Sequence, residues 1–142
     1  MTSYPIQMKS FSVPRWRIKR VIDGDTFEIS VNTWPRFADV MSIRIDGIDT
    51  AEMRGASEFE KALAQEAKEH LQRILKRALW VRCSNVRRDK FGGRVLASVS
   101  ANGRCVAKQM ISEGLARPYD GGERKPWTRR PRKRSKIGRA HV

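Results

Sequence analysis

An amphipathic pattern over residues 57–78 is the feature of this sequence that most constrains its fold. Ser57 and Glu60 have the spacing of a capping box, a pairing that opens many helices. After them, apolar residues recur at spacings that place them on one face of a helix. These residues are Leu63, Ala67, Leu71, Ile74, Leu75 and Ala78. The pattern predicts one long helix that ends near Arg77.

Strand patterns precede this helix. The run V-I-D-G-D-T-F-E-I-S-V is broken by an Asp-Gly turn, after which Phe27, Ile29 and Val31 alternate with polar residues. A loop is expected over residues 32–39. The run M-S-I-R-I-D-G-I-D follows it and places Arg44 on the face opposite to its apolar neighbours.

Further strands follow the helix. Residues 79–83 alternate as L-W-V-R-C, with Leu79 on the apolar side, and a turn at D-K-F-G-G precedes R-V-L-A-S-V-S. A short helix over about 105–113 ends before Gly114, which suits the left-handed position after a helix. Cys83 and Cys105 lack the spacing of metal ligands and are expected to be buried thiols. Together these patterns predict an α+β, mainly β fold: a small barrel with helices packed outside it.

The positive charge is concentrated at the two ends of the chain. Residues 1–20 carry five basic and no acidic side chains, and residues 117–142 carry ten basic and two acidic ones. Residues 21–116 are nearly balanced, with fifteen basic and thirteen acidic side chains. A segment such as R-K-P-W-T-R-R-P-R-K-R is too polar to pack and would attract a polyanion. Nucleic acid is therefore the expected partner, and a solvated tail that aids solubility is the alternative.

No apolar run in the sequence is long enough to span a membrane, and residues 1–12 lack the apolar core of a signal peptide. We expect a cytoplasmic protein by default, or a secreted or periplasmic one if a signal was removed. The basic tail is not accompanied by an amphipathic helix with a broad apolar face, so a membrane is not expected as a partner. A monomer is expected.

Acidic residues gather at two points where a strand gives way to a loop. Asp23 and Asp25 lie in D-G-D-T, and Asp46, Asp49 and Glu52 lie in R-I-D-G-I-D-T-A-E. Hard divalent cations such as calcium take carboxylate and carbonyl oxygens as ligands. Asp-Gly pairs also make tight turns and cap local backbone, which is the alternative for either cluster alone. Because each cluster follows an apolar strand, one rim of a sheet could hold both.

Hydrolysis of a phosphodiester needs a group that activates water, a metal that neutralises phosphate and fixed cations for the transition state. The aspartates could bind the metal and Glu52 could act as the base. Planar guanidinium groups suit the fixed cations because they bind phosphate through two donors. Arg44 is a candidate, since it lies on an apolar strand shortly before Asp49. An arginine on a strand is otherwise often a solvated surface group.

Four motifs occur in one order: V-I-D-G-D-T, R-I-D-G-I-D-T-A-E, D-K-F-G-G-R-V-L-A and G-L-A-R-P-Y. With the intervening helix, this set resembles the staphylococcal nuclease (thermonuclease-like) family. The resemblance implies an OB-fold, a five-stranded β-barrel with flanking α-helices, that cleaves DNA and RNA with little sequence preference using Ca²⁺. It divides the chain into a basic N-terminal extension (1–17), a nuclease domain (18–122) and a basic, disordered tail (123–142).

The resemblance also implies roles for single residues. Asp25 and Asp49 match the calcium-binding carboxylates, and Thr50 matches the residue whose backbone carbonyl completes the protein ligands. Asp23 would reach the metal through water. Glu52 resembles the glutamate that activates water. Arg44 and Arg94 resemble the pair that binds the phosphate and stabilises the transition state.

The sequence departs from the family pattern at two points. Ala51 stands where the family usually has a proline, whose ring would fix φ before Glu52. The usual D-K-Y-G-R is D-K-F-G-G-R here, with an extra glycine. The register of R-V-L-A favours Arg94 as the second arginine rather than Arg87 or Arg88. Phe91 lacks the hydroxyl that would touch phosphate. Tyr119 lies where the family stacks an aromatic ring on a base, although a hinge tyrosine would look the same.

A non-catalytic module is the alternative function. OB-folds hold single strands through basic grooves and stacked aromatic rings without cutting them. A degraded site would have lost part of the polar set, and this sequence retains every member. Calcium-dependent cleavage is therefore the favoured hypothesis.

Overall fold

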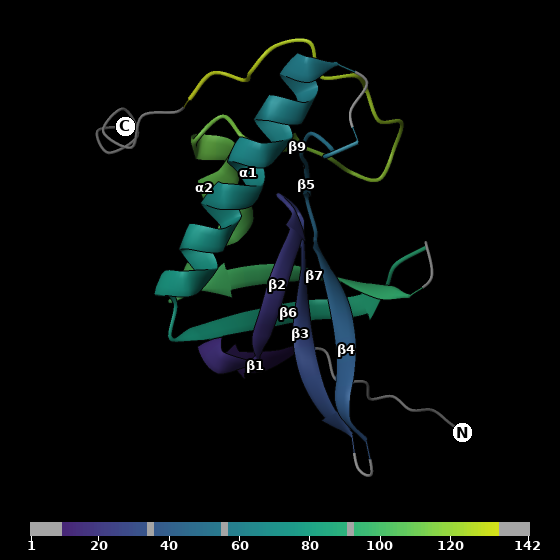
Figure 1. Ribbon diagram of the computed structural model, residues 1–142, viewed down its shortest axis with the longest axis vertical. Coiled ribbons are helices and arrows are strands. Elements are labelled where there is room, and N and C mark those ends of the chain that lie inside the picture. Colours follow the sequence, from purple (N-terminus) through teal and green to yellow (C-terminus); the bar gives the residue numbers. More distant parts are fainter. Residues whose placement is uncertain (1–9, 34–35, 55–56, 91–92, 134–142) are drawn as a thin grey trace.

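The computed structural model describes residues 10–33, 36–54, 57–90 and 93–133. Its strands and helices are shown in Figure 1. In chain order they are β1 (Ser10–Pro14), the 3-10 helix η1 (Arg15–Arg17), β2 (Ile18–Asp23), β3 (Thr26–Thr33), β4 (Arg36–Ile45), β5 (Ile48–Asp49), α1 (Glu58–Arg77), β6 (Trp80–Arg88), β7 (Arg94–Ala101), β8 (Arg104–Cys105), α2 (Val106–Ser112) and β9 (Arg117–Pro118).

One curled sheet of seven strands forms the body of the described chain. Its path is β1-β6-β7-β4-β3-β2, and β8 pairs with β7. All pairings are antiparallel except β4 with β7, which is parallel. β2, β3 and β4 run across β6 and β7, so the sheet bends round on itself (Figure 1). The sheet has more strands than the predicted five because β1 and β8 also join it.

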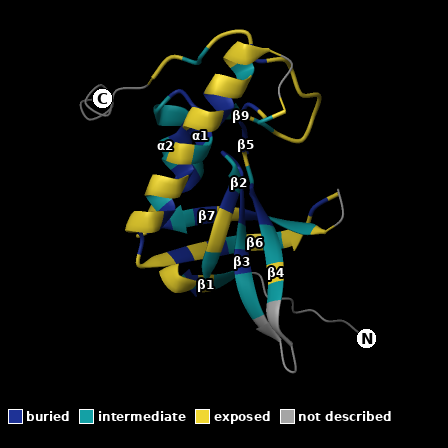
Figure 2. Cartoon of the chain, viewed as in Figure 1, coloured by how far each residue is buried: buried dark blue, intermediate teal, exposed yellow. Residues whose placement is uncertain are grey.

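The predicted long helix is confirmed. The hydroxyl of Ser57 accepts a hydrogen bond from the backbone N–H of Glu60 at 3.1 Å, as the capping box requires. The stripe is buried at Leu63, Ala67, Leu71 and Leu75, and Ile74 packs against the core while partly exposed. Figure 2 shows the opposite face of α1 exposed. The stripe covers the sheet beside β2 and closes the core over Phe27, Ile43, Ile45 and Met110.

Three local predictions were wrong. The expected loop over residues 32–39 is strand where it is described, because β3 and β4 remain paired as far as Thr33 and Arg36; residues 34 and 35 lie outside the described ranges. Leu79 is 63% exposed rather than in the core, since it lies in the connection between α1 and β6. Cys83 is a buried thiol as expected, but Cys105 is exposed.

Both basic ends of the chain contribute to the structure. In the N-terminal extension, β1 pairs with β6 from Ser10 opposite Ser84 to Pro14 opposite Trp80. Residues 123–133 form no helix or strand, yet Trp127 is only 4% exposed. This part of the tail lies against the domain, which its polar composition did not lead us to expect. Within the described ranges, no helix has the length and apolar character needed to cross a membrane.

Gly24 allows α1 to approach the loop between β2 and β3. A Cβ atom placed on Gly24 would lie 2.7 Å from the Cβ of Ala67 and 3.2 Å from the side chain of Thr50. We therefore expect Gly24→Ala to lower the free energy of unfolding by about 1–3 kcal/mol, as overpacked cores do. Urea denaturation measures this, and adding Ala67→Gly should recover part of the loss. Equal stability of Gly24→Ala and the unmodified protein would contradict this packing.

Candidate active site

Arg44 is buried in the sheet although it carries a charge. It lies on β4 between Ile43 and Ile45, which face the core, and its own side chain points to the other face. Arg44 is 7% exposed. Its Nη1 donates to the carbonyl oxygens of Ile45 at 3.1 Å and Ile48 at 3.3 Å. A buried charge needs such partners, so Arg44 is fixed in place rather than solvated.

Asp25 is the acidic partner of this arginine. Its Oδ2 lies 3.5 Å from Nη2 of Arg44, and both side chains are 9% exposed. The Oδ1 atom accepts a hydrogen bond from the hydroxyl of Thr26 at 2.9 Å. The backbone carbonyl of Asp25 also accepts from the N–H of Ile45 at 2.8 Å. The first acidic cluster and the β4 arginine are thus held together by the register of β3 and β4.

The second acidic cluster reaches the same place through the short pair β5–β9. In this pair Asp49 lies opposite Arg117. Asp49 is 1% exposed, and its Oδ2 accepts from Nη2 and Nε of Arg117 at 3.0 and 3.2 Å. The guanidinium of Arg117 stacks on Trp127, with Cζ 4.0 Å from the ring centroid. The buried tryptophan of the tail therefore holds the arginine that holds Asp49.

Arg124 joins the predicted metal ligands to each other. Its Nη2 lies 2.5 Å from Oδ1 of Asp49 and donates to the carbonyl oxygen of Thr50 at 3.2 Å. Its Nη1 donates to the carboxylate of Glu52. Burial alone would lower the pKa of Arg124, but the charges of Asp49, Glu52 and Asp25 together raise it. The guanidinium of Arg124 thus lies among the oxygens of Asp49 and Thr50, which the family resemblance implied as metal ligands.

One buried hydroxyl in this cluster, that of Thr50, has no hydrogen-bond partner among the described residues. Oδ1 of Asp49 is also buried, and its close partner is Nη2 of Arg124. No group of three Asp, Glu, His or Cys side chains in the described ranges is arranged to hold a metal. The expected ligand set contains only two carboxylates, and its third protein ligand is a carbonyl.

Glu52 and Asp23 border the cluster. The side chain of Glu52 is 49% exposed, so solvent reaches it. Burial raises the pKa of Asp23 above its ordinary value, and repulsion from Asp25 and Glu52 raises it further. A hydrogen bond with the backbone of Met53 and the charge of Lys68 lower this pKa only in part. The end of β2 therefore carries a carboxyl group whose ionised form is disfavoured by burial and by its acidic neighbours.

Arg94 lies on the same face of the sheet as Arg44. In the parallel pair of β4 and β7, Ser42 is opposite Arg94 and Arg44 is opposite Leu96, so both arginines point to one side. Both line a cavity of about 400 Å³ that Tyr119 and Arg124 also border. Arg94 donates to the carboxylate of Asp89. Burial alone would raise the pKa of Asp89, but its hydrogen bond to Arg94 and the charges of Arg94 and Arg44 lower it.

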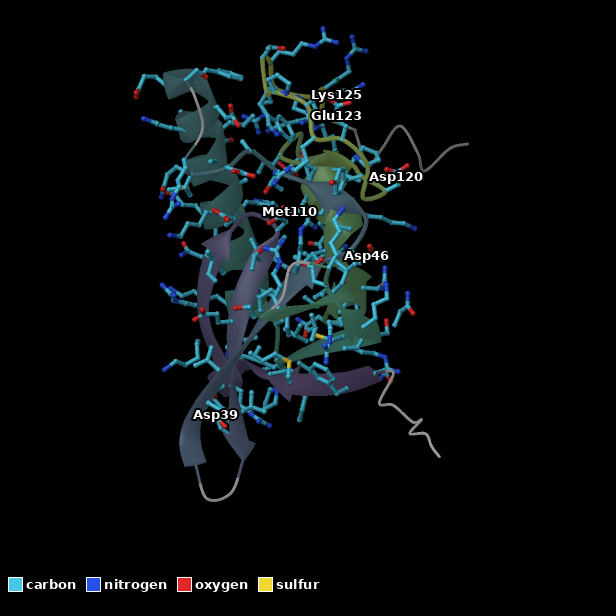
Figure 3. The ribbon with its side chains drawn as sticks, turned by 90° about the vertical axis from the view of Figure 1, so that its right-hand side faces the viewer. Asp39, Asp46, Met110, Asp120, Glu123 and Lys125 are labelled. Carbon is cyan, nitrogen blue, oxygen red and sulfur yellow. The ribbon has the colours of Figure 1, made fainter. Side chains whose placement is uncertain are left out.

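Of the two aromatic residues predicted to bind substrate, the structure describes only Tyr119. The ring centroid of Tyr119 lies 5.5 Å from Cζ of Arg44, and its hydroxyl donates to the carbonyl of Gly122 at 2.6 Å. Phe91 lies outside the described residues. Figure 3 shows the tail loop, with Asp120, Glu123 and Lys125, at the end of the molecule beyond Asp46, whereas Asp39 lies on the distant β3–β4 hairpin.

Three residues of this cluster were not predicted from the sequence: Asp89, Arg117 and Arg124. Arg117 lies in G-L-A-R-P-Y, so its motif was recognised but its contact with Asp49 was not. Arg124 was counted as part of a solvated tail. The available sequence signal that this segment packs was Trp127, a large apolar residue between two basic runs. The structure buries it.

The raised pKa of Asp23 predicts a pH-dependent stability. A carboxyl group whose pKa rises on folding destabilises the fold above that raised pKa and has no effect below its unfolded pKa, 3.8. In protein treated with a chelator, Asp23→Asn should raise Tm by a few degrees at neutral pH, and the gain should shrink as the pH falls. Asp39→Asn, on the distant hairpin, is the control. A gain that grows toward acid pH would contradict the proposed repulsion.

Comparison with curated proteins found no match. A family model described as staphylococcal nuclease homologue matches residues 42–136, which is more than half of the chain. The match begins within β4 and includes Arg44 and most of the site described above, but not Asp23 and Asp25. The curled sheet with its two helices is accordingly an OB-fold, as the sequence motifs implied. This chain belongs to the staphylococcal nuclease homologue family.

Proposed function

We propose that this protein is a calcium-dependent endonuclease that hydrolyses phosphodiester bonds of DNA and RNA with little sequence specificity. The observation that carries the proposal is the convergence at one end of the sheet of a buried arginine and two buried carboxylates. Arg44, Asp25 and Asp49 come from three different strands or loops, and each is less than a tenth exposed. Burying three charges together costs free energy, and clusters of this kind are candidates for functional sites.

The donor set suits a hard cation. Asp25, Asp49 and the carbonyl of Thr50 would hold Ca²⁺, which prefers oxygen ligands of this kind. The burial of Asp49 supports this assignment, because a carboxylate that is only 1% exposed needs a cation beside it. Arg124 now supplies that positive charge, so it would leave these oxygens when a metal arrives. Bound calcium would neutralise phosphate charge next to the reacting bond.

The remaining residues supply binding and proton transfer. Arg44 and Arg94, which line the same cavity, would bind the phosphate oxygens and stabilise the charge that grows on them in the transition state. Glu52 is exposed enough to meet water and would accept its proton as the water oxygen attacks phosphorus. The P–O bond to the leaving nucleotide would then break, and its oxygen would take up a proton from solvent water. Asp89 would keep Arg94 in position through their hydrogen bond.

One observation favours the alternative, a non-catalytic OB-fold module that binds single strands. Arg124 contacts Asp49, Thr50 and Glu52 at once. If that contact persists when nucleic acid binds, it excludes a metal and leaves only a basic binding surface. The two functions therefore differ in what Arg124 does. Under either function the partner is nucleic acid, and a monomer remains our prediction.

Substitutions in the site should lower the cleavage rate far more than matched substitutions outside it. With millimolar Ca²⁺ and single-stranded DNA, Arg44→Ala should lower kcat by about 10²–10³-fold, because it removes a fixed transition-state cation. Glu52→Gln should lower it by about 10²–10⁴-fold, because it removes the base. Glu58→Gln, an exposed carboxylate on α1, and Arg20→Ala, an exposed arginine on β2, are matched controls.

Cleavage is measured by release of acid-soluble nucleotide with purified protein, with and without a chelator. Equal activity of Glu52→Gln and the unmodified protein would exclude the proposed role of Glu52. A protein that binds single-stranded DNA but never cuts it, with or without Ca²⁺, would establish the binding module instead.

Removing Arg124 should strengthen calcium binding. The substitution Arg124→Ala takes a positive charge away from Asp49 and frees the carbonyl of Thr50. Isothermal titration with Ca²⁺ alone should show a Kd at least about tenfold lower, which corresponds to about 1.4 kcal/mol. Lys125→Ala is the control, because it changes the net charge equally at the next residue. An unchanged or higher Kd for Arg124→Ala would show that Arg124 does not compete with the metal.

A further inference from the structure

Large apolar side chains are exposed at the opposite end of α1 from its N-terminus. Trp16 is 76% exposed, Leu79 63% and Trp80 56%. Trp16 belongs to η1, and the other two residues lie where α1 gives way to β6. The proposed site uses none of the three. Exposed tryptophans are unusual enough on a folded surface to require an explanation.

The backbone brings these residues together. Pro14 pairs with Trp80 at the junction of β1 and β6. The next residue, Arg15, donates its backbone N–H to the carbonyl of Leu79 at 3.1 Å. Trp16 therefore follows directly on the contact that includes Leu79. Figure 2 shows this corner of the sheet, near β1 and the start of β6, as largely exposed.

Cations surround the apolar side chains. Arg17 lies over the ring of Trp16, with Cζ 5.9 Å from the centroid, and Arg15 donates to the carbonyl of Lys76 at the end of α1 at 2.9 Å. Arg82 shares the outer face of β6 with Trp80. We call Arg15, Trp16, Arg17, Leu79, Trp80 and Arg82 the tryptophan patch.

No acidic residue lies in the segments that build the tryptophan patch. Residues 10–22 and 70–88 contain neither Asp nor Glu, although they include ten Lys and Arg side chains. A surface that pairs flat aromatic rings with unopposed positive charge is complementary to a polymer with phosphates and bases. Single-stranded nucleic acid offers both, because its bases are free to stack while the phosphates meet the arginines.

We propose that the tryptophan patch is a second binding surface for single-stranded nucleic acid, separate from the cleavage site. The identity of the polymer rests on the proposed function. The patch lies near Arg77, ten residues along α1 from Ala67, the residue that faces Gly24 beside Thr50. At about 1.5 Å per residue, this separation is about 15 Å. This gap takes about four nucleotides at about 3.4 Å each. With the nucleotides bound at each surface added, a strand of about eight or more would occupy both, which falls within the site sizes of OB-folds.

Binding to oligo-dT of two lengths tests the proposal. Fluorescence anisotropy with chelator present keeps the strands intact, and lengths of about 20 and about 4 nucleotides separate long from short substrates. Trp16→Ala and Trp80→Ala should each weaken binding of the long strand by about tenfold, the usual effect of losing one stacked base. Binding of the short strand should be unchanged. Phe59→Ala, at the other end of α1 and 43% exposed, is the matched control.

Several outcomes would overturn the proposal. Unchanged binding of the long strand to both tryptophan variants would do so, even if the protein cleaves DNA. If the alanine variants lose binding to vesicles of phosphatidylglycerol and phosphatidylcholine but keep their binding to oligonucleotides, the patch would be a membrane-binding surface instead.

If an alanine variant folds poorly by circular dichroism, Trp16→Phe and Trp80→Phe replace it, and both should retain most of the oligonucleotide binding. Tryptophan-dependent binding without any cleavage would support the patch while contradicting the proposed function.

Discussion

The buried charge of Arg44 connects the β-sheet to the candidate active site. On β4, Arg44 stands between two core isoleucines, Ile43 and Ile45, and its side chain points to the opposite face of the sheet. Once buried there, it requires oxygen partners, and the structure provides carbonyls of the following turn and the carboxylate of Asp25. Those partners in turn fix the loop after β2 and the turn after β4. Arg44 thus holds the first acidic cluster through Asp25 and the start of the second through the carbonyl of Ile48.

The tail completes the electrostatic balance. Arg117 and Arg124 neutralise Asp49 and Glu52, and the stacking of Arg117 on Trp127 anchors the segment that carries them. Two arginines thus supply, at this cluster, the positive charge that the proposed function assigns to a divalent cation. Their contacts hold the buried carboxylate of Asp49 in place.

Much of the fold could be predicted because its signals are local. The capping box at Ser57 and the stripe below it determine α1, and period-two alternation determines the inner strands. The incorrect predictions concern residues whose structure depends on tertiary contacts. The hairpin ends around residues 32–39 are stabilised by cross-strand bonds, and Leu79 is exposed because the chain turns there.

The site was predictable to the extent that its residues lie in contiguous motifs. Asp25, Arg44 and Asp49 do, and the structure brings them together. The contacts of Arg117 and Arg124 with Asp49 cross about seventy residues of chain and leave no periodic signal. Basic composition alone indicated a solvated tail, whereas the burial of Trp127 and the ion pairs of Arg124 place its described part against the domain.

A crystal structure with Ca²⁺ and a nucleoside bisphosphate would test the central claim most directly. The nuclease proposal predicts calcium between Asp25, Asp49 and the carbonyl of Thr50, a phosphate held by Arg44 and Arg94, and Arg124 turned away from Asp49. A complex in which Arg124 keeps its contacts with Asp49 and Thr50, and in which no calcium joins the phosphate, would contradict it.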